Sequence, residues 1–261
     1  MKSPAIAKAV AILDDLAHSN ELGAISAIAR RTGMAKSSVA DICSTLSVLG
    51  LLSRGRDGRY LLGRHIVELA RGLVGGRRLI EVFAEACDAA PECRDETVTL
   101  SILDGSDIVI VAVRHGRPTL PITPRIGLRL PAWATASGRC FLSVLPADEV
   151  AEILTGASAT SAGVAGRLPS SSCLMAELAT QERAGYFVDD ESTAAGMTGF
   201  GAGVKEGGAV VAAVVVATRS DTLTPERARR LGAAAHAIAA ECETRASSAD
   251  DACSTRGIAS G

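Results

Sequence analysis

Residues 25–62 read ISAIARRTGMAKSSVADICSTLSVLGLLSRGRDGRYLL, and the predicted fold of the N-terminal part of the chain follows from these residues. Apolar residues recur at helical spacing over residues 25–32 and again over residues 36–49, with Gly33 between the two runs. Short apolar segments then flank Gly-Arg-Asp-Gly at residues 55–58, a sequence that suits a tight hairpin turn. The stretch therefore predicts a short helix, a glycine turn, a second helix and a β-hairpin.

One more helix is predicted before this stretch. Ser3 and Pro4 are typical of a helix cap and first turn. A single apolar stripe follows at helical spacing, made of Ile6, Ala9, Val10, Leu13 and Leu16. The order of three helices and a hairpin is the layout of a winged helix-turn-helix, whose third helix enters the major groove of DNA.

The helix over residues 36–49 has two unlike sides. The inward side is predicted to hold Val39, Ile42, Cys43, Leu46 and Leu49. The outward side is predicted to hold Ser37, Ala40, Asp41, Ser44 and Val48. We predict DNA contacts from the start of this helix and from the hairpin, through Lys36, Ser37, Ser38, Ser44, Arg54, Arg56 and Arg59. In the alternative, the helix residues only cap and solvate the helix, and the arginines only protect a sheet edge.

Charge is distributed unevenly along the chain. Residues 1–78 contain 12 Lys or Arg and 6 Asp or Glu, whereas the remaining residues contain 15 and 23. A basic head on an acidic body favours contact between the head and a polyanion such as DNA. A basic surface that is merely solvated is the alternative.

The chain after residue 64 is predicted to form an α+β domain that follows a linker. We expect a winged helix-turn-helix at residues 1–64, a linker helix at 65–76, a second domain at 77–245 and a disordered tail at 246–261. Strands are expected near residues 96–103, 108–113, 186–188, 197–204 and 209–218. Helices are expected near residues 137–144, 147–154, 172–184 and 225–244.

Composition excludes several classes of protein. With 261 residues, 48% apolar and 21% charged, the chain is neither collagen-like nor disordered overall. Seven cysteines without a C-x-x-C pair indicate reduced thiols that fill the core of a cytoplasmic protein. No apolar run is long enough to span a bilayer, so we expect no membrane partner.

Six short motifs, taken in order, resemble the isocitrate lyase regulator (IclR) family of bacterial transcription factors. They are AKAVAIL at residues 7–13, GMAKSSV at 33–39, YLLG at 60–63, GLRLP at 127–131, ATASG at 134–138 and GYFVDDE at 185–191. The resemblance covers about residues 3–244. It implies a GAF-like effector-binding domain after the linker helix, and homodimers, often paired into homotetramers, on palindromic double-stranded operators.

The resemblance also implies an effector site for a small molecule. Carried over position by position, the site residues are Ile122, Leu130, Ala136, Ser137, Asp189, Met197, Gly199, Val215 and Ala217. The last two positions are serines in family members that bind small carboxylates. Because Val215 and Ala217 supply no hydroxyl, we expect a larger or less polar ligand than a two- or three-carbon acid. Arg125 or Arg129 as an anion partner is a weaker alternative to a solvated loop arginine.

One departure from the family affects the DNA-contacting helix. The family usually has a basic residue where this chain has Asp41. Either Asp41 accepts a hydrogen bond from a cytosine amine or it points away from DNA, and the second interpretation is favoured here.

No residue pattern indicates catalysis, a metal or a cofactor. Ser137 has no G-x-S-x-G context and none of the four histidines nearby in sequence, so helix capping is the better interpretation. Asp189, Asp190 and Glu191 lack a His or Cys at ligand spacing.

From the winged helix-turn-helix pattern and the family resemblance, we predict a ligand-responsive repressor. The rivals are an enzyme or binding protein whose N-terminal helices only dimerise, and an architectural protein without an effector.

Overall fold

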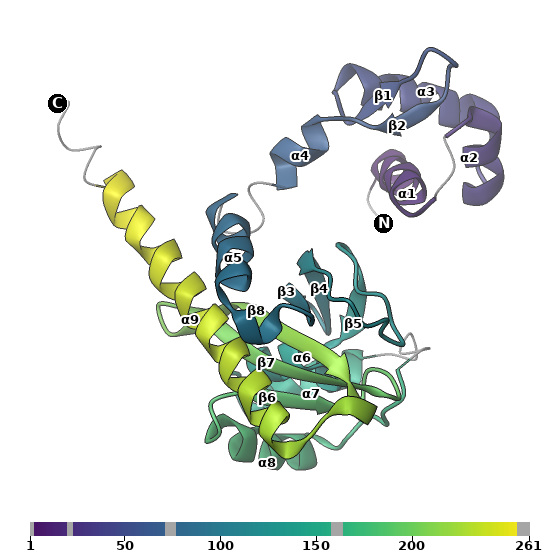
Figure 1. The fold of residues 1–261 in the computed structure, drawn as a ribbon. Helices are drawn as coiled ribbons and strands as arrows, with labels where there is room; N and C mark the ends of the chain where they lie inside the picture. Colours follow the sequence, from purple (N-terminus) through teal and green to yellow (C-terminus); the bar gives the residue numbers. More distant parts are fainter. Residues whose placement is uncertain (1–2, 20–22, 71–76, 158–163, 255–261) are drawn as a thin grey trace. The chain divides into compact units, whose positions relative to one another are not determined.

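The computed structural model describes residues 3–19, 23–70, 77–157 and 164–254. The chain divides into two compact units, Met1–Gly76 and Arg77–Gly261, and each unit has its own core. The N-terminal unit contains, in order, α1 (Pro4–His18), α2 (Ile25–Thr32), α3 (Lys36–Val48), β1 (Leu52–Arg54), β2 (Tyr60–Leu62) and α4 (His65–Ala70) (Figure 1). This order confirms the predicted winged helix-turn-helix.

Apolar side chains from all three helices and the hairpin form the core of this unit. The buried set is Ile12, Ile28, Ala29, Val39, Cys43, Leu46, Leu52 and Tyr60. Gly33 ends α2 with φ +70°, a left-handed conformation that glycine adopts without strain, and so lets α3 start in a new direction. The β1–β2 register is antiparallel, with Ser53 opposite Leu61.

Three predicted core positions in this unit are exposed. Ile6 and Val10, expected on the buried stripe of α1, are 66% and 49% exposed, whereas Ile12 is fully buried. Periodicity identified an apolar side of α1, but burial follows the surfaces that α2, α3 and β2 offer to it. Leu49 is also exposed, because it ends α3 just before the chain turns at Gly50.

The C-terminal unit is built on one antiparallel sheet of six strands in the order β5-β4-β3-β8-β7-β6. Its strands are β3 (Thr97–Asp104), β4 (Asp107–Arg114), β5 (Arg129–Pro131), β6 (Phe187–Asp190), β7 (Met197–Glu206) and β8 (Ala209–Arg219). The sequence predicted five of the six. The missed strand, β5, has three residues, too few for an alternating pattern to emerge.

Helices cover both faces of this sheet. They are α5 (Arg77–Ala89), α6 (Ala136–Leu142), α7 (Ala147–Gly156), α8 (Ser171–Glu182) and α9 (Pro225–Ser254), with 3-10 turns η1 (Pro91–Cys93), η2 (Ala132–Ala134) and η3 (Ser220–Thr222). Figure 1 shows α5 and α9 on one face and α6 on the other. This mixed helix-and-sheet unit confirms the predicted α+β class.

The residues of β7 alternate between the two faces of the sheet, with glycines on one face and larger side chains on the other. A β-carbon added to Gly201 would lie 2.7 Å from the carbonyl oxygen of Ala136, so the glycine side of β7 meets α6. Phe200, on the other side, packs edge to face against Tyr186, whose ring lies against Gly232 of α9. The glycines of β7 therefore let α6 approach the sheet closely.

The end of the chain differs from the predicted tail. The last helix was expected to stop near Thr244, but α9 continues to Ser254, which overlaps the tail predicted to be disordered. The extension is rich in alanine and charged or small residues, and alanine is the best helix former. Residues 255–261 of that tail and residues 71–76 of the predicted linker helix lie outside the described residues. No helix among the described residues is long and apolar enough to cross a membrane.

Candidate functional site

The exposed side of α3 presents short polar side chains and one lysine. Lys36, Ser37 and Ser44 are exposed, Ser38 is half-buried, and Val39, Cys43 and Leu46 on the opposite side are buried. The predicted outward side is therefore accessible within the N-terminal unit. This is the geometry that a helix needs if it is to reach base edges.

Asp41 lies on this same side of α3. Positions 37, 41 and 44 are four and three residues apart, so they share one face of the helix, and Asp41 is exposed. This placement agrees with the outward side predicted from the sequence. It favours the base contact over the interpretation that Asp41 points away from DNA, and both stay predictions.

The hairpin carries three exposed arginines. The guanidinium of Arg54 lies 5.6 Å from the centre of the Tyr60 ring and donates a long hydrogen bond, 3.4 Å, to the carbonyl of Gly58. Arg59 lies 3.6 Å from the carboxylate of Asp57. Arg56 lies exposed at the turn between them. The turn thus holds two arginines at its base and presents a third at its tip.

In the C-terminal unit, four of the predicted effector residues come together on the α6 face of the sheet. A β-carbon on Gly199 would lie 3.3 Å from Val215 Cγ1, 3.6 Å from the β-carbon of Ala136 and 3.7 Å from that of Asp189. These residues come from four different elements, β7, β8, α6 and β6. They are far apart in the sequence, and strand pairing and helix packing bring them together. Tertiary structure alone assembles this group.

Three more predicted residues form an apolar cluster beside this group. Met197, Ala217 and Ile122 pack with Leu120 and Ala194. Ala217 is the cross-strand neighbour of Gly199, so the cluster adjoins the Gly199 group on the same face. The two sets together form a small, largely apolar surface.

Leu130 and Ser137 are placed differently from the other predicted residues. Leu130 pairs with Ile108 on β4 and packs into the core around Trp133, away from the Met197 cluster. Ser137 is not the helix cap. Thr135 caps α6 by accepting from Gly138 N at 2.9 Å, and the buried Ser137 hydroxyl donates to Thr135 Oγ1 at 3.3 Å.

Asp189 holds a loop in place. Its Oδ1 accepts hydrogen bonds from the backbone of Ser192 at 2.8 Å and Thr193 at 3.1 Å, and Thr193 Oγ1 donates to the Ala134 carbonyl at 3.2 Å. Burial raises the pKa of the Asp189 carboxyl, although the hydrogen bonds from Thr193 and Ser192 and the charge of Arg139 oppose the shift. Asp189 therefore connects the loop after β6 to the turn before α6.

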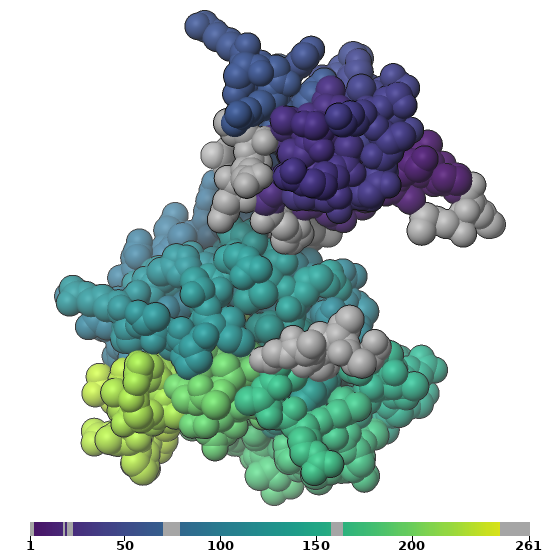
Figure 2. All heavy atoms as spheres, turned by 90° about the vertical axis from the view of Figure 1, so that its right-hand side faces the viewer, coloured from purple at the N-terminus to yellow at the C-terminus, as the bar shows by residue number. Residues whose placement is uncertain are grey.

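The two loop arginines are placed differently from each other. Arg129 pairs with Asp104 at 2.6 Å and with Asp107 at 3.3 Å, which ties β5 to the β3–β4 hairpin. Arg125 is solvent-exposed. Arg129 is exposed, as a solvated arginine would be, and its ion pairs also give it a structural role. Figure 2 shows that the residues coloured teal, which lie near the middle of the sequence and belong to the C-terminal unit, form a continuous surface in this view.

The predicted effector site does not include the hydroxyl residues of β3. Thr97, Thr99 and Ser101 are all buried and lie opposite Ala217, Val215 and Ala213, on the α6 face. Thr97 Oγ1 accepts from Gly116 N at 3.0 Å. The sequence holds a signal for this placement. Val98, Leu100 and Ile102 alternate with the hydroxyl residues along the strand, so the hydroxyl residues share the opposite face.

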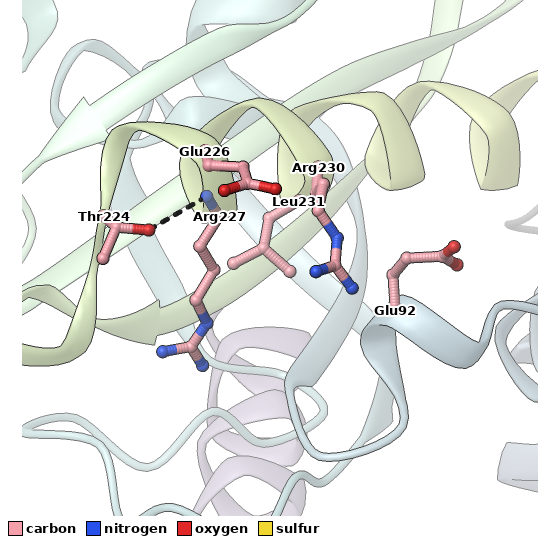
Figure 3. Close-up of a pocket in the computed structure, with 6 residues that line it drawn as sticks. All are labelled: Glu92, Thr224, Glu226, Arg227, Arg230 and Leu231. Atoms are coloured by element: carbon pink, nitrogen blue, oxygen red, sulfur yellow. Dashed lines mark hydrogen bonds between the residues drawn. The ribbon is translucent and has the colours of Figure 1, made fainter.

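A separate pocket of about 310 Å³ lies at the start of α9. Figure 3 shows Thr224 just before α9 and Arg227 and Arg230 on its first turns, with Glu92 of η1 across from them. Arg227 is committed elsewhere, since it pairs with Glu96 and donates to Thr218 Oγ1 at 3.3 Å. None of the predicted effector residues lines this pocket, which has acidic and basic walls.

Other predicted features have structural explanations. Five cysteines are buried, which agrees with the expectation that most of them fill the core, whereas Cys173 is exposed. Asp190 and Glu191 are exposed. The described residues contain no cluster of His, Cys, Asp and Glu suited to a metal ion.

Comparison with known proteins assigns both units. The IclR helix-turn-helix domain model matches residues 5–56, and the C-terminal domain model of bacterial IclR regulators matches residues 74–244. The transcriptional regulator KipR of Bacillus subtilis (strain 168) is 32% identical over 72% of this chain and 74% of its own.

Two solved structures extend the comparison. The Agobacterium tumefaciens repressor BlcR is 29% identical, with a TM-score of 0.57 over 94% of this chain and 97% of that one. An IclR homologue of Microbacterium hydrocarbonoxydans, solved with 4-hydroxybenzoate, is 23% identical, with a TM-score of 0.77 over 92% and 99%. Such relatives are regulators and not enzymes. From the two domain models and these relatives, the chain belongs to the IclR family of DNA-binding transcriptional regulators.

Proposed function

We propose that this chain is a ligand-responsive repressor that binds a palindromic operator as a homodimer or homotetramer and is released or modulated by a small, relatively apolar acid. One observation carries the DNA part of this proposal. The exposed side of α3, with Lys36, Ser37 and Ser44, belongs to a winged helix-turn-helix whose hairpin carries three exposed arginines. Repressors also occur among the relatives.

In this mechanism α3 enters the major groove of each half-site. Ser37 and Ser44 face base edges, and Lys36 and Arg56 neutralise phosphates. Asp41, which shares the exposed side with the serines, accepts a hydrogen bond from a cytosine amine. The arginines of the hairpin contact phosphates or the adjacent minor groove. Two such units per dimer read half-sites about one helical turn apart.

Exposed apolar residues of the N-terminal unit support a dimer. Ile6 and Val10 on α1 and Val67 and Leu69 on α4 are each about half or more exposed. Sedimentation velocity of Val67→Ser/Leu69→Ser should give a smaller species than wild type. Ile126→Ser removes an apolar residue that is 70% exposed on the other unit and serves as the matched control.

The effector part rests on the surface formed by Ala136, Met197, Gly199, Val215 and Ala217. Small and apolar side chains line it, which suits the body of an aromatic or medium-chain acid. The homologue solved with 4-hydroxybenzoate supports an acid of this class. Such a ligand changes DNA affinity only if it binds one arrangement of the dimer better than the other.

Salt-dependent DNA binding tests the proposal. Anisotropy titrations of a labelled random-sequence duplex should give a log-log salt slope that falls by about 0.9 for each phosphate contact removed. We expect that reduction in Lys36→Ala and Arg56→Ala, and none in Lys205→Ala, which removes an exposed charge from β7. A wild-type affinity for DNA that does not change with salt concentration would contradict the proposal.

A further inference from the structure

Strand β3 presents two chemically different faces. Val98 and Leu100 are fully buried and lie opposite Val216 and Val214, on the face covered by α9. Thr97, Thr99 and Ser101 alternate with them and are 4%, 6% and 1% exposed. A strand buried on both faces therefore places three hydroxyls against α6.

Each of these hydroxyl residues has an apolar cross-strand neighbour. Thr97 lies opposite Ala217, Thr99 opposite Val215 and Ser101 opposite Ala213. The same face of β7 adds Met197 and three glycines, Gly199, Gly201 and Gly203. Alanine, valine, methionine and glycine side chains offer no strong hydrogen-bonding group. Along this part of β3, β7 and β8, the side-chain hydroxyls on the α6 face therefore all come from β3.

The three hydroxyls are not equally engaged. Thr97 Oγ1 accepts a hydrogen bond from Gly116 N. Ser101 Oγ is buried and has no hydrogen-bond partner among the described residues. A buried polar group without a partner destabilises the folded state, so such a group in a folded protein calls for an explanation.

Trp133 contributes a second unpartnered buried donor to the same core. Its Nε1 has no hydrogen-bond partner among the described residues. The two cross-strand neighbours of Ser101, Ile110 and Ala213, belong to the same packed cluster as Trp133. The core beneath α6 therefore has unused hydrogen-bonding capacity from both the sheet and η2.

We propose that Thr99 and Ser101 form the polar end of the effector site and select an acid whose apolar body carries a second oxygen, such as a hydroxyl. This inference rests on the effector binding proposed above. The apolar body lies against Gly199 and Val215, and the second oxygen completes the hydrogen bonding of Ser101. Sites built to bond a ligand hydroxyl discriminate strongly against the analogue that lacks it.

Matched acids that differ by one hydroxyl test this selection. The probes are benzoate with 4-hydroxybenzoate, and hexanoate with 6-hydroxyhexanoate. Binding to the full chain is measured by calorimetry and by the emission of Trp133, the single tryptophan. For at least one pair, wild type should bind the hydroxy acid about tenfold or more tightly than its partner.

Variants of two β3 residues, Ser101 and Thr99, assign that preference to β3. Ser101→Ala should reduce the preference to about threefold or less while it keeps the affinity for the acid without a hydroxyl. Thr99→Val should weaken binding of the hydroxy acid, and Thr99→Ser should restore it. Ser143→Ala is the matched control, since its hydroxyl is bonded to the Cys140 carbonyl and faces no predicted effector residue. A thermal unfolding temperature for Ser101→Ala that is equal to or above that of wild type excludes misfolding as the cause, because the hydroxyl that it removes has no partner.

The possible failures are distinguishable. If wild type binds none of the four acids, or shows no preference within either pair, the inference is overturned. An unchanged preference in Ser101→Ala also overturns it. If simple acids bind and change DNA affinity but the hydroxyl has no effect, the repressor proposal stands and only this inference fails.

Discussion

The guanidinium of Arg31 on α2 forms a two-pronged ion pair with the carboxylate of Asp15 on α1. Arg31 Nε lies 2.6 Å from Asp15 Oδ1, and Nη2 lies 2.7 Å from Oδ2. The Asp15 side chain is 10% exposed and that of Arg31 is 25% exposed, so solvent screens the pair only partly. The pair joins the first two helices. It also removes Arg31 from the basic residues that are free to meet phosphate.

Breaking this pair should destabilise the N-terminal unit. A double-mutant cycle of Asp15→Asn and Arg31→Gln should give a coupling energy of about 1–2 kcal/mol, because the bond is charge-assisted and two-pronged. Urea denaturation of the full chain, followed by far-ultraviolet circular dichroism, measures it. Arg30→Gln, an exposed neighbour on α2, should have little effect. Strictly additive single variants would contradict the coupling.

Gly138 in α6 should not tolerate a side chain. A β-carbon there would overlap the backbone of Ala132, including its carbonyl oxygen, and backbone cannot move aside cheaply. We expect Gly138→Ala to lower stability by about 1–3 kcal/mol or more. Gly156, at the end of α7, has open space around that position, so Gly156→Ala should be neutral or slightly stabilising. Thermal unfolding of both variants checks the contrast, and equal losses would refute it.

The Asp189 carboxyl should make stability depend on pH. Its pKa is raised in the folded state, mainly by burial, so the folded state favours the protonated form. That stability is fully present below the unfolded pKa and is lost as pH rises through the folded pKa. Asp189→Asn, which keeps an acceptor for Ser192 and Thr193, should therefore gain stability relative to wild type between acidic and neutral pH.

Denaturant unfolding across that pH range tests this expectation. Asp189→Ala should be less stable at every pH, by about 1–3 kcal/mol, because two backbone N–H groups lose their acceptor. Parallel pH profiles for wild type and Asp189→Asn would show that Asp189 is not the titrating group.

Thiol reactivity should separate one cysteine from the buried set. Burial raises the pKa of Cys43 and Cys242 to about 11, and that of Cys87 and Cys93 to about 12. These thiols stay protonated at pH 8, whereas Cys173 on α8 is exposed. Brief treatment with iodoacetamide, followed by peptide mass spectrometry, should find Cys173 alkylated before the other four. Early modification of Cys87 or Cys93 would contradict their burial.

Local signals accounted for most secondary-structure elements. The proline after Ser3 marks the start of α1, Gly33 separates α2 from α3, and the Asp-Gly turn marks the hairpin. The predictions were wrong at positions where tertiary packing decides which side chains are buried and which cluster they join. The stripe on α1 was correctly apolar, yet Ile6 and Val10 have no described core against them. Leu130 follows its strand pairing with Ile108 and so lies in a different cluster from Met197.

Caps, turns and side-chain periodicity act over a few residues, so they were enough to predict the order of most elements, the class of each unit and the polar side of α3. Which side chains share the α6 face of the sheet depends instead on tertiary packing. Gly199, Val215, Asp189 and Ala136 meet there through strand pairing and helix packing between residues far apart in the chain. The same long-range pairing places the hydroxyls of β3 beside Val215 and Ala213, since strand register, and not local preference, sets cross-strand neighbours.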